Sequence, residues 1–330
     1  MTCRLFAASG LVLAVSLVAC GGGRPPIANG QGAAAVDPET LCLSEDCASR
    51  SMVGVVPDAE NILYASNGQV FVSGGTNVFE VRAAADQSYT LRPLAETACN
   101  FTGLAERANT VYAACGDQSL YAMSLLGGTQ LQKIHTLDGM SLPNGMAVGP
   151  DDCLYIVDGP LSGTALPSPK IERVCLSFDP LAVASQETWL DQGLELPNGI
   201  AAYGQGIVLT NSTLLLPSSQ VLWIGMNDQG LPTEPTVLYS RISIFDDLSV
   251  VGDHILVSDF AGGSVFMLNA NGEVVQETAV QGFAFPSALQ LVGPPQFNLG
   301  DILITEKGIL GDTQSSFGNV LTLFRQSPAE

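Results

Sequence analysis

Positive charge is scarce in this sequence. The 330 residues include 12 Lys and Arg against 32 Asp and Glu, so the formal net charge is −20 at pH 7. Nucleic acids and anionic membranes attract proteins mainly through clustered basic side chains. We therefore expect no nucleic-acid partner, and membrane contact only through a lipid at the N-terminus.

Several common site motifs are also missing. No GxSxG sequence is present, which excludes the usual nucleophilic serine of esterases. The cysteines lack CxxC spacing, and His135 and His254 are isolated in sequence, so a thiolate zinc site is not expected. Aromatic residues make up only 7% of the chain, which gives little support for an aromatic partner-binding face. Because no stretch has a helix-length period of 3.6 residues, the sequence favours an all-β domain.

The N-terminus is typical of an exported protein. Arg4 precedes an apolar run, 5–19, that is too short for a comfortable membrane span, so residues 1–19 read as a signal peptide. The sequence LVAC ending at Cys20 resembles a bacterial lipobox, which implies acylation of Cys20. An ordinary signal peptide is the alternative. Residues 20–49 begin with a Gly-, Ala- and Pro-rich stretch that predicts a flexible tether. Since Gly21 is not Asp, the resemblance favours a lipid-anchored protein of the cell envelope, in the outer membrane of a Gram-negative bacterium.

Cysteine usage agrees with export. Apart from Cys3 and Cys20, the cysteines fall into three close pairs: Cys42 with Cys47, Cys99 with Cys115, and Cys153 with Cys175. In an oxidising compartment we expect each pair to form a local disulfide. Other pairings stay open, because sequence proximity is a preference rather than a deduction.

A hairpin repeat organises residues 50–330. The segment LPNGMAVGPDDCLYIVD, 142–158, recurs in degraded form, with a polar residue before two short apolar strands that end in Asp or Asn. The polar position is occupied in turn by Glu60, Thr102, Asn144, Asn198, Asp246 and Ser287, at separations of 42, 42, 54, 48 and 41 residues. This period predicts a six-bladed β-propeller with four-stranded antiparallel blades. The run 51–56 would supply the outer strand of blade 6 and close the ring.

The repeat also predicts a site. Residues at the start of each innermost strand should meet at one mouth of the channel, which brings together Glu60, Asn144, Asn198 and Asp246, with Asp247 beside them. Thr102 and the strand-end residues Asp158, Asn211 and Asp259 should lie around them as substrate-binding candidates. Carboxylate and amide oxygens without Lys or Arg suit a divalent cation, Ca²⁺ before Zn²⁺, Mn²⁺ or Mg²⁺. The alternative is that Asn-Gly and Asp-Asp are ordinary turn residues.

At these positions the chain resembles the senescence-marker-protein/gluconolactonase family, with its luciferin-regenerating-enzyme-like region, and the related paraoxonases. These are six-bladed propellers that hold a divalent ion and open lactones or esters. The resemblance implies metal ligation by Glu60, Asn144, Asn198 and Asp246. In paraoxonases an Asn ligand follows the last of these, where this chain has Asp247.

Other positions depart from the family. Leu142 replaces the Arg that gluconolactonases use on their sugar substrate, and 100–103 lacks the His of paraoxonases. Asn61 and Gly145 replace the acidic ligands of the second paraoxonase Ca²⁺ site. The resemblance therefore implies the fold and the metal more strongly than the substrate.

Two functions remain open from the sequence. The first is a monomeric, metal-dependent hydrolase of a small lactone or ester, in which the ion polarises the carbonyl and Asp246 or Asp247 is the general base. The second is a non-catalytic propeller, tethered to the envelope, that binds a partner or ligand and holds a structural Ca²⁺.

Overall fold

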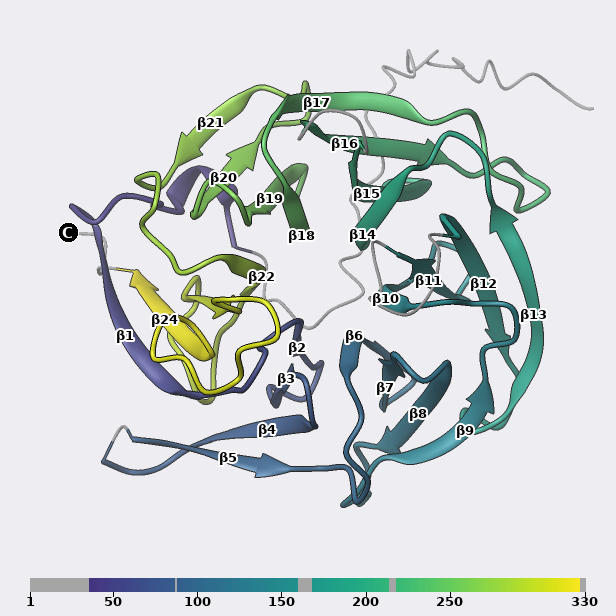
Figure 1. Ribbon diagram of the computed structural model, residues 1–330, viewed down its shortest axis with the longest axis horizontal. Helices are drawn as coiled ribbons and strands as arrows, with labels where there is room; N and C mark the ends of the chain where they lie inside the picture. Colours follow the sequence, from purple (N-terminus) through teal and green to yellow (C-terminus); the bar gives the residue numbers. More distant parts are fainter. Residues whose placement is uncertain (1–35, 87, 160–167, 214–217, 327–330) are drawn as a thin grey trace, which may run out of the picture.

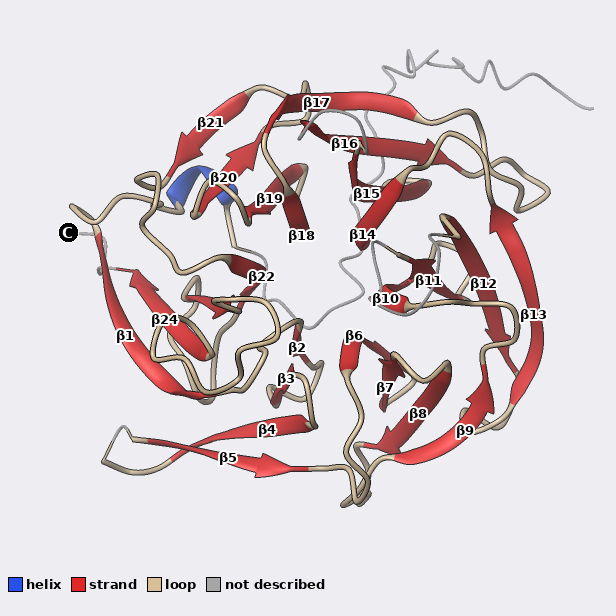
Figure 2. Ribbon diagram, in the orientation of Figure 1, coloured by secondary structure: helices blue, strands red, loops and turns tan. Residues whose placement is uncertain are grey.

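The computed structural model is a closed ring of six four-stranded antiparallel sheets around a central axis (Figure 1). It describes residues 36–86, 88–159, 168–213 and 218–326. Strands dominate these ranges, and the helix drawn in Figure 2 is a short 3₁₀ turn, η1 (Pro38–Thr40). The six-bladed all-β propeller expected from the repeat is confirmed. The signal peptide and Cys20 lie outside the described residues.

The strands follow one another from the axis outward in each blade. Blade 1 contains β2 (Ile62–Tyr64), β3 (Val70–Ser73), β4 (Val78–Ala83) and β5 (Tyr89–Pro93). Blade 2 contains β6 (Phe101–Arg107), β7 (Thr110–Cys115), β8 (Ser119–Ser124) and β9 (Gln132–Thr136). Blade 3 contains β10 (Pro143–Val148), β11 (Leu154–Asp158), β12 (Lys170–Leu176) and β13 (Val183–Leu190). Blade 4 contains β14 (Leu196–Tyr203), β15 (Gly206–Ser212), β16 (Ser218–Gly225) and β17 (Thr236–Ile242). Blade 5 contains β18 (Phe245–Val251), β19 (His254–Asp259), β20 (Ser264–Leu268) and β21 (Val274–Glu277).

Blade 6 joins the two ends of the folded chain. Its inner strands are β22 (Pro286–Leu291), β23 (Ile302–Glu306) and β24 (Val320–Gln326), and its outer strand is β1 (Ala48–Val55). β1 pairs antiparallel with β24 from Ala48 opposite Gln326 to Val55 opposite Val320. The ring therefore closes with an N-terminal strand, as the sequence predicted, and Figure 1 shows β1 lying beside β24.

The core consists of apolar clusters between neighbouring blades. Each cluster takes residues from two adjacent sheets; one, for example, packs Phe71 of blade 1 against Phe101 and Leu104 of blade 2. Inner strands such as β7 are buried along their whole length, because blades cover both of their faces. Outer strands such as β13 are exposed or half-buried except at single positions such as Trp189. Continuous apolar runs thus become inner strands, and the more polar runs become outer ones.

The segment before β1 is also packed against the ring. Leu41 and Leu43 are buried in the cluster between blades 5 and 6. The backbone N–H of Leu43 donates to Gln276 Oε1 at 2.9 Å, and that of Cys42 to Gln326 Oε1 at 2.9 Å. The packed part of the chain therefore begins before residue 50. The tether expected over 20–49 stays a prediction for residues 20–35, which lie outside the described residues.

The three expected disulfides are confirmed. Cys42–Cys47 lies in the segment before β1, Cys99–Cys115 joins the segment just before β6 to the end of β7, and Cys153–Cys175 joins the residue before β11 to β12. Over the ranges that the structure describes, no helix has the length and apolar character needed to cross a membrane.

The innermost strands approach one another closely at the axis. A Cβ atom on Gly145 would lie 2.3 Å from the backbone oxygen of Asn198 in the next blade, and one on Gly103 would lie 2.2 Å from that of Asn144. Neither glycine has a positive φ, so backbone conformation does not require glycine at these positions. The close approach of the neighbouring strand is what leaves no room for a side chain. Asn144-Gly145 and Asn198-Gly199 lie within β10 and β14, so these two pairs are not hairpin turns.

Buried hydroxyl groups reinforce these contacts. Thr210 on β15 donates to the backbone oxygen of Asp246 at 2.5 Å. Thr305 on β23 donates to that of Glu60 at 2.9 Å. Each hydroxyl thus holds the polar residue of the following blade in place.

We expect Gly145→Ala to destabilise the protein by about 1–3 kcal/mol, because the added methyl group forces blades 3 and 4 apart. Urea unfolding followed by circular dichroism measures the change. Gly116→Ala is the matched control, since its Cβ would meet nothing nearer than Leu142 Cδ1 at 3.4 Å, an ordinary contact. Equal stability of the two variants would contradict this account of the axis.

Candidate metal centre and adjoining cavity

Glu60, Asn144, Asn198 and Asp246 meet at the axis as expected. All four line one small void of about 10 Å³, close to the space that one water-sized occupant needs. They also form the floor of a larger cavity of about 610 Å³. Four oxygen-bearing side chains from blades 1, 3, 4 and 5 thus share one centre at the bottom of a cavity.

A local irregularity aims these side chains inward. In blades 3, 4 and 5 the strand register shifts at the polar residue: between Pro143 and Met146, between Pro197 and Ile200, and between Phe245 and Leu248. Such bulges turn side chains away from the regular alternation and are frequent beside functional sites. The polar residues therefore face the axis.

Burial and mutual repulsion disfavour the charged forms of the two carboxyl groups. Burial raises the pKa of Asp246 well above its usual value, and the charges of Glu60 and Asp247 raise it further. Burial also raises the pKa of Glu60, although the Lys307 ammonium opposes this shift. A cation at this position would remove much of the cost of charging both groups.

Lys307 supplies a cation that the sequence analysis missed. Its Nζ forms an ion pair with Glu60 Oε2 and lies 3.3 Å from Asp58 Oδ1. The Lys307 side chain is only 12% exposed. Burial by itself would lower the pKa of Lys307, but Glu60, Asp58 and Asp246 raise it above its usual value, so the ammonium stays charged. The expectation that no Lys or Arg lies among these oxygens was wrong.

A sequence signal for Lys307 did exist. Lys307 directly follows Glu306, the last residue of β23, and the ends of such strands return to the site mouth. A Lys directly after a strand-end carboxylate therefore falls at the same mouth as the polar residues.

The two asparagines differ in their bonding. Asn198 donates from Nδ2 to Asp246 Oδ1, whereas the side chain of Asn144 makes no hydrogen bond with another described residue. The oxygen and nitrogen of an amide exchange by a simple flip, so Asn198 can also present its oxygen to the void. Both residues can therefore serve as neutral oxygen ligands.

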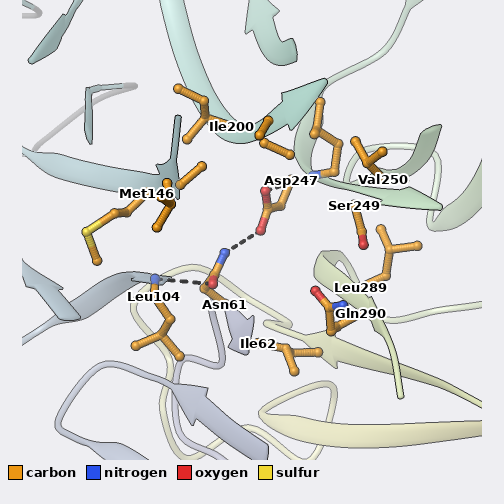
Figure 3. A pocket seen from close by; sticks show the side chains of 15 residues that line it. Asn61, Ile62, Leu104, Met146, Ile200, Asp247, Ser249, Val250, Leu289 and Gln290 are labelled. Carbon is orange, nitrogen blue, oxygen red and sulfur yellow. Dashed lines mark hydrogen bonds between the residues drawn. The ribbon is translucent and has the colours of Figure 1, made fainter. Parts of the chain in front are cut away.

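Asp247 lies on the other side of the centre from the large cavity. It lines the small void and a second cavity of about 60 Å³, and it accepts a hydrogen bond from Asn61 Nδ2 (Figure 3). Burial raises the pKa of Asp247 to about 7; hydrogen bonds from Leu248 N–H and Asn61 lower it, and the charge of Glu60 raises it. Of the two expected general bases, only Asp246 is among the residues that line the large cavity.

The strand-end residues that were expected to bind substrate instead accept hydrogen bonds from backbone N–H groups. Asp158 accepts hydrogen bonds from the backbone N–H groups of Ser141 and Leu142, which precede β10. Asn211 accepts from the N–H of Glu195 at 3.0 Å, before β14. These side chains fix the start of the innermost strand.

Asp259 is engaged in the same way. Its carboxylate accepts from Ser243 Oγ and from the backbone N–H of Gly262, and it forms an ion pair with Arg241. Asp158, Asn211 and Asp259 do not line the large cavity as the structure describes it, so their expected contact with substrate gains no support. Thr102 does line this cavity, although its hydroxyl donates to Pro143 O at 2.8 Å.

The walls of the large cavity come mainly from residues two positions before the polar ones. In blades 1 and 2 these are Asp58 and Asn100, and in blades 3, 4 and 5 they are Leu142, Leu196 and Ile244. The cavity thus has a polar side at blades 1 and 2 and an apolar side at blades 3 to 5.

The residues at the floor fit a divalent cation. Two carboxylates and two amides give a hard, oxygen-rich ligand set, and the void has the size of one small occupant. The Lys307 ammonium, bonded to one of these carboxylates, is the feature that departs from a simple oxygen ring.

Comparisons with known proteins support the fold. No family model matches the sequence, and no curated protein matches it. Among solved structures, a calcium-binding regucalcin from Agrobacterium tumefaciens is 16% identical, with a TM-score of 0.64, covering 85% of this chain and 94% of that one. A luciferin-regenerating enzyme is 11% identical, with a TM-score of 0.64, over 86% and 98% of the two chains.

Another similar structure has a different activity. A putative glucose dehydrogenase from Thermus thermophilus is 16% identical, with a TM-score of 0.58, over 84% of this chain and 99% of that one. These likenesses establish the propeller fold that the sequence resemblance implied. They leave the activity open, because one fold serves several chemistries here.

We expect Asp247 to make the metal-free protein less stable as pH rises. Its pKa is raised from 3.8 to about 7. The folded state therefore favours the neutral acid, whose contribution is complete below about pH 4 and is lost as pH rises through about 7. Asp247→Asn lacks this loss, so its melting temperature should rise relative to wild type across that window. Thermal unfolding in the presence of chelator, recorded between about pH 4 and 8, measures this difference in melting temperature. Asp228→Asn, at an exposed position, is the control. A difference between Asp247→Asn and wild type that does not change with pH would refute the prediction.

Proposed function

We propose that this protein is a divalent-metal-dependent hydrolase of small lactones or esters with an apolar body. The observation that carries this proposal is the position of the four oxygen-bearing side chains at the floor of a cavity of about 610 Å³. A purely structural ion would not require a substrate-sized space above it.

The ion would be held by Glu60, Asn144, Asn198 and Asp246, and when bound it supplies Lewis acidity to a carbonyl oxygen. Asp246 is the general base that the geometry favours. Asp246 lines both the small void and the large cavity, so one of its carboxylate oxygens would hold the ion while the other takes a proton from the attacking water. The same oxygen then returns the proton to the departing alkoxide, so that a lactone and water give a hydroxy acid.

The apolar side of the cavity selects the substrate body. Leu142, Leu196 and Ile244 face the cavity, and Phe260 and Leu310 extend the apolar surface. A polyhydroxylated ring would lose hydrogen bonds to water against this surface, whereas an alkyl or aryl group would gain by burial. We therefore propose an apolar lactone or ester in preference to a sugar lactone.

We further propose that the enzyme is exported and works as a monomer, anchored through a lipid on Cys20 in the outer membrane of a Gram-negative bacterium. The three disulfides support an oxidising compartment. The acidic composition supports the absence of a nucleic-acid partner.

One observation favours the second function, a non-catalytic, envelope-tethered propeller that uses its cavity to bind a ligand. The ion pair of Lys307 with Glu60 neutralises part of the carboxylate charge without chemistry. The two functions make opposite predictions for turnover, so one assay separates them.

Chelation should abolish hydrolysis of aryl esters and lactones by the purified protein. Asn198→Ala and Asp246→Ala should each lower kcat/KM by about 100-fold or more, since each removes a ligand. Chelator should also lower the melting temperature, because an ion that binds only the folded state stabilises it. Asp228→Ala, at an exposed position, is the control. Activity that is indifferent to chelator and to both substitutions would refute the mechanism.

The apolar wall gives a prediction about specificity. Leu142→Ser and Leu196→Ser should each lower kcat/KM for an alkyl-substituted lactone by about tenfold, because a contact with the apolar body is lost. The rate on an unsubstituted lactone should change little. Leu126→Ser, which alters an exposed residue outside the cavity, serves as control. Equal losses on both substrates would show that the wall does not contact the substituent.

A further inference from the structure

Lys307 is held in place by the hydrogen-bonded loop between β23 and β24. The loop runs from the end of β23 to the start of β24, and it begins with backbone hydrogen bonds from Lys307 N–H to Phe285 O and from Gly308 N–H to Ala284 O, both at 3.0 Å. Phe317 of the loop packs edge-on against Phe285, with ring centroids 5.9 Å apart. The ammonium is thus positioned by the fold.

The other end of the loop is tied to the chain that carries Glu60. Asn319 donates from Nδ2 to Asp312 O at 2.9 Å within the loop, and its Oδ1 accepts from the backbone N–H of Asp58 at 2.7 Å. The loop of blade 6 and the start of blade 1 therefore form one unit, which sets Lys307 against both Asp58 and Glu60.

The ammonium and a metal ion would both need the Glu60 carboxylate. Glu60 Oε2 bonds to Lys307 Nζ, and Glu60 lines the small void where the ligand set converges. A divalent ion in that void would lie within a few ångströms of a fixed positive charge, and repulsion between them in a buried site is strong. Asp58 Oδ1, 3.3 Å from Nζ on the cavity side, offers the ammonium a second partner.

We propose that Lys307 is a built-in competitor for the metal: its ammonium holds Glu60 in the metal-free protein and moves onto Asp58 when an ion binds. Without an ion, the lysine keeps the carboxylates apart and the site assembled. With an ion, its residual repulsion keeps the affinity low, so that the protein exchanges metal readily. This inference rests on the proposed metal site but not on hydrolysis.

Calcium titration by calorimetry tests the competition. Lys307→Met should bind Ca²⁺ about tenfold or more tightly than wild type, because a nearby positive charge has been removed. The calcium-free variant should melt at a lower temperature than wild type, and Ca²⁺ should restore more of its stability. Lys307→Gln, which keeps a hydrogen-bond donor but no charge, gives the same test if the Met variant does not fold.

Lys170→Met is the matched control. Lys170 is also mostly buried and paired with a carboxylate, Glu172, at 2.9 Å, but in blade 3 and outside the lining of the cavity. It should leave Ca²⁺ affinity unchanged. Lys307→Arg should retain weak binding, because it keeps the charge.

A double-mutant cycle tests the movement onto Asp58. Asp58→Asn should weaken Ca²⁺ binding in the wild-type background more than in the Lys307→Met background, since only the former needs the second partner. Equal effects in both backgrounds would refute the movement.

Two outcomes would contradict the proposed competition between Lys307 and the metal. They differ in whether the calcium site itself is also contradicted. If wild type binds Ca²⁺ and Lys307→Met binds it no more tightly, the lysine does not compete and the proposed hydrolase is unaffected. If neither protein binds Ca²⁺, the competition fails together with a calcium site.

Discussion

The inner strands of neighbouring blades approach so closely at the axis that a methyl group would not fit between some of them. Gly103 and Gly145 occupy such contacts, and the hydroxyls of Thr210 and Thr305 bond across to the next blade. This contact distance fixes the radius of the ring at its centre. The polar residues therefore share a void no larger than one small occupant, although the chain separates them by up to 186 residues between Glu60 and Asp246.

Crowding of oxygen atoms in so small a space creates an electrostatic problem that the protein must solve. Burial and mutual repulsion disfavour charge on Glu60 and Asp246, and the Lys307 ammonium of blade 6 offsets part of that charge. A divalent metal ion would offset more of it, because it carries two positive charges. The centre thus fits either of two cations, the lysine of the chain or the divalent ion that we propose, and the cavity above it is the space that the proposed hydrolysis would use.

The repeat predicted most of the fold. Its period corresponds to the six blades, and the run 51–56, which precedes the first repeat, corresponds to the outer strand of blade 6. The repeat also predicted that Glu60, Asn144, Asn198 and Asp246 meet at the axis, because residues at or just before the start of an innermost strand lie at the mouth of the channel. It did not reveal that Asp247 faces away from the large cavity, because a bulge breaks the alternation there. Nor did it show that Asp158 and Asn211 bind backbone amides, because a strand-end carbonyl or carboxylate has the same sequence pattern whichever partner it finds.

The seam between blades 6 and 1 has a further consequence for the order in which the molecule is made. Of the strands that the structure describes, β1 is synthesised first and β24 last, yet the two lie side by side. The pair of Lys307 with Glu60 spans the same junction, bringing residues from the two ends of the fold into contact. An emerging chain can stack its middle blades as they appear, but the Lys307–Glu60 pair needs residues from both ends of the fold. Until blade 6 has been made and has docked beside blade 1, the buried carboxylates must therefore do without the lysine that neutralises part of their charge.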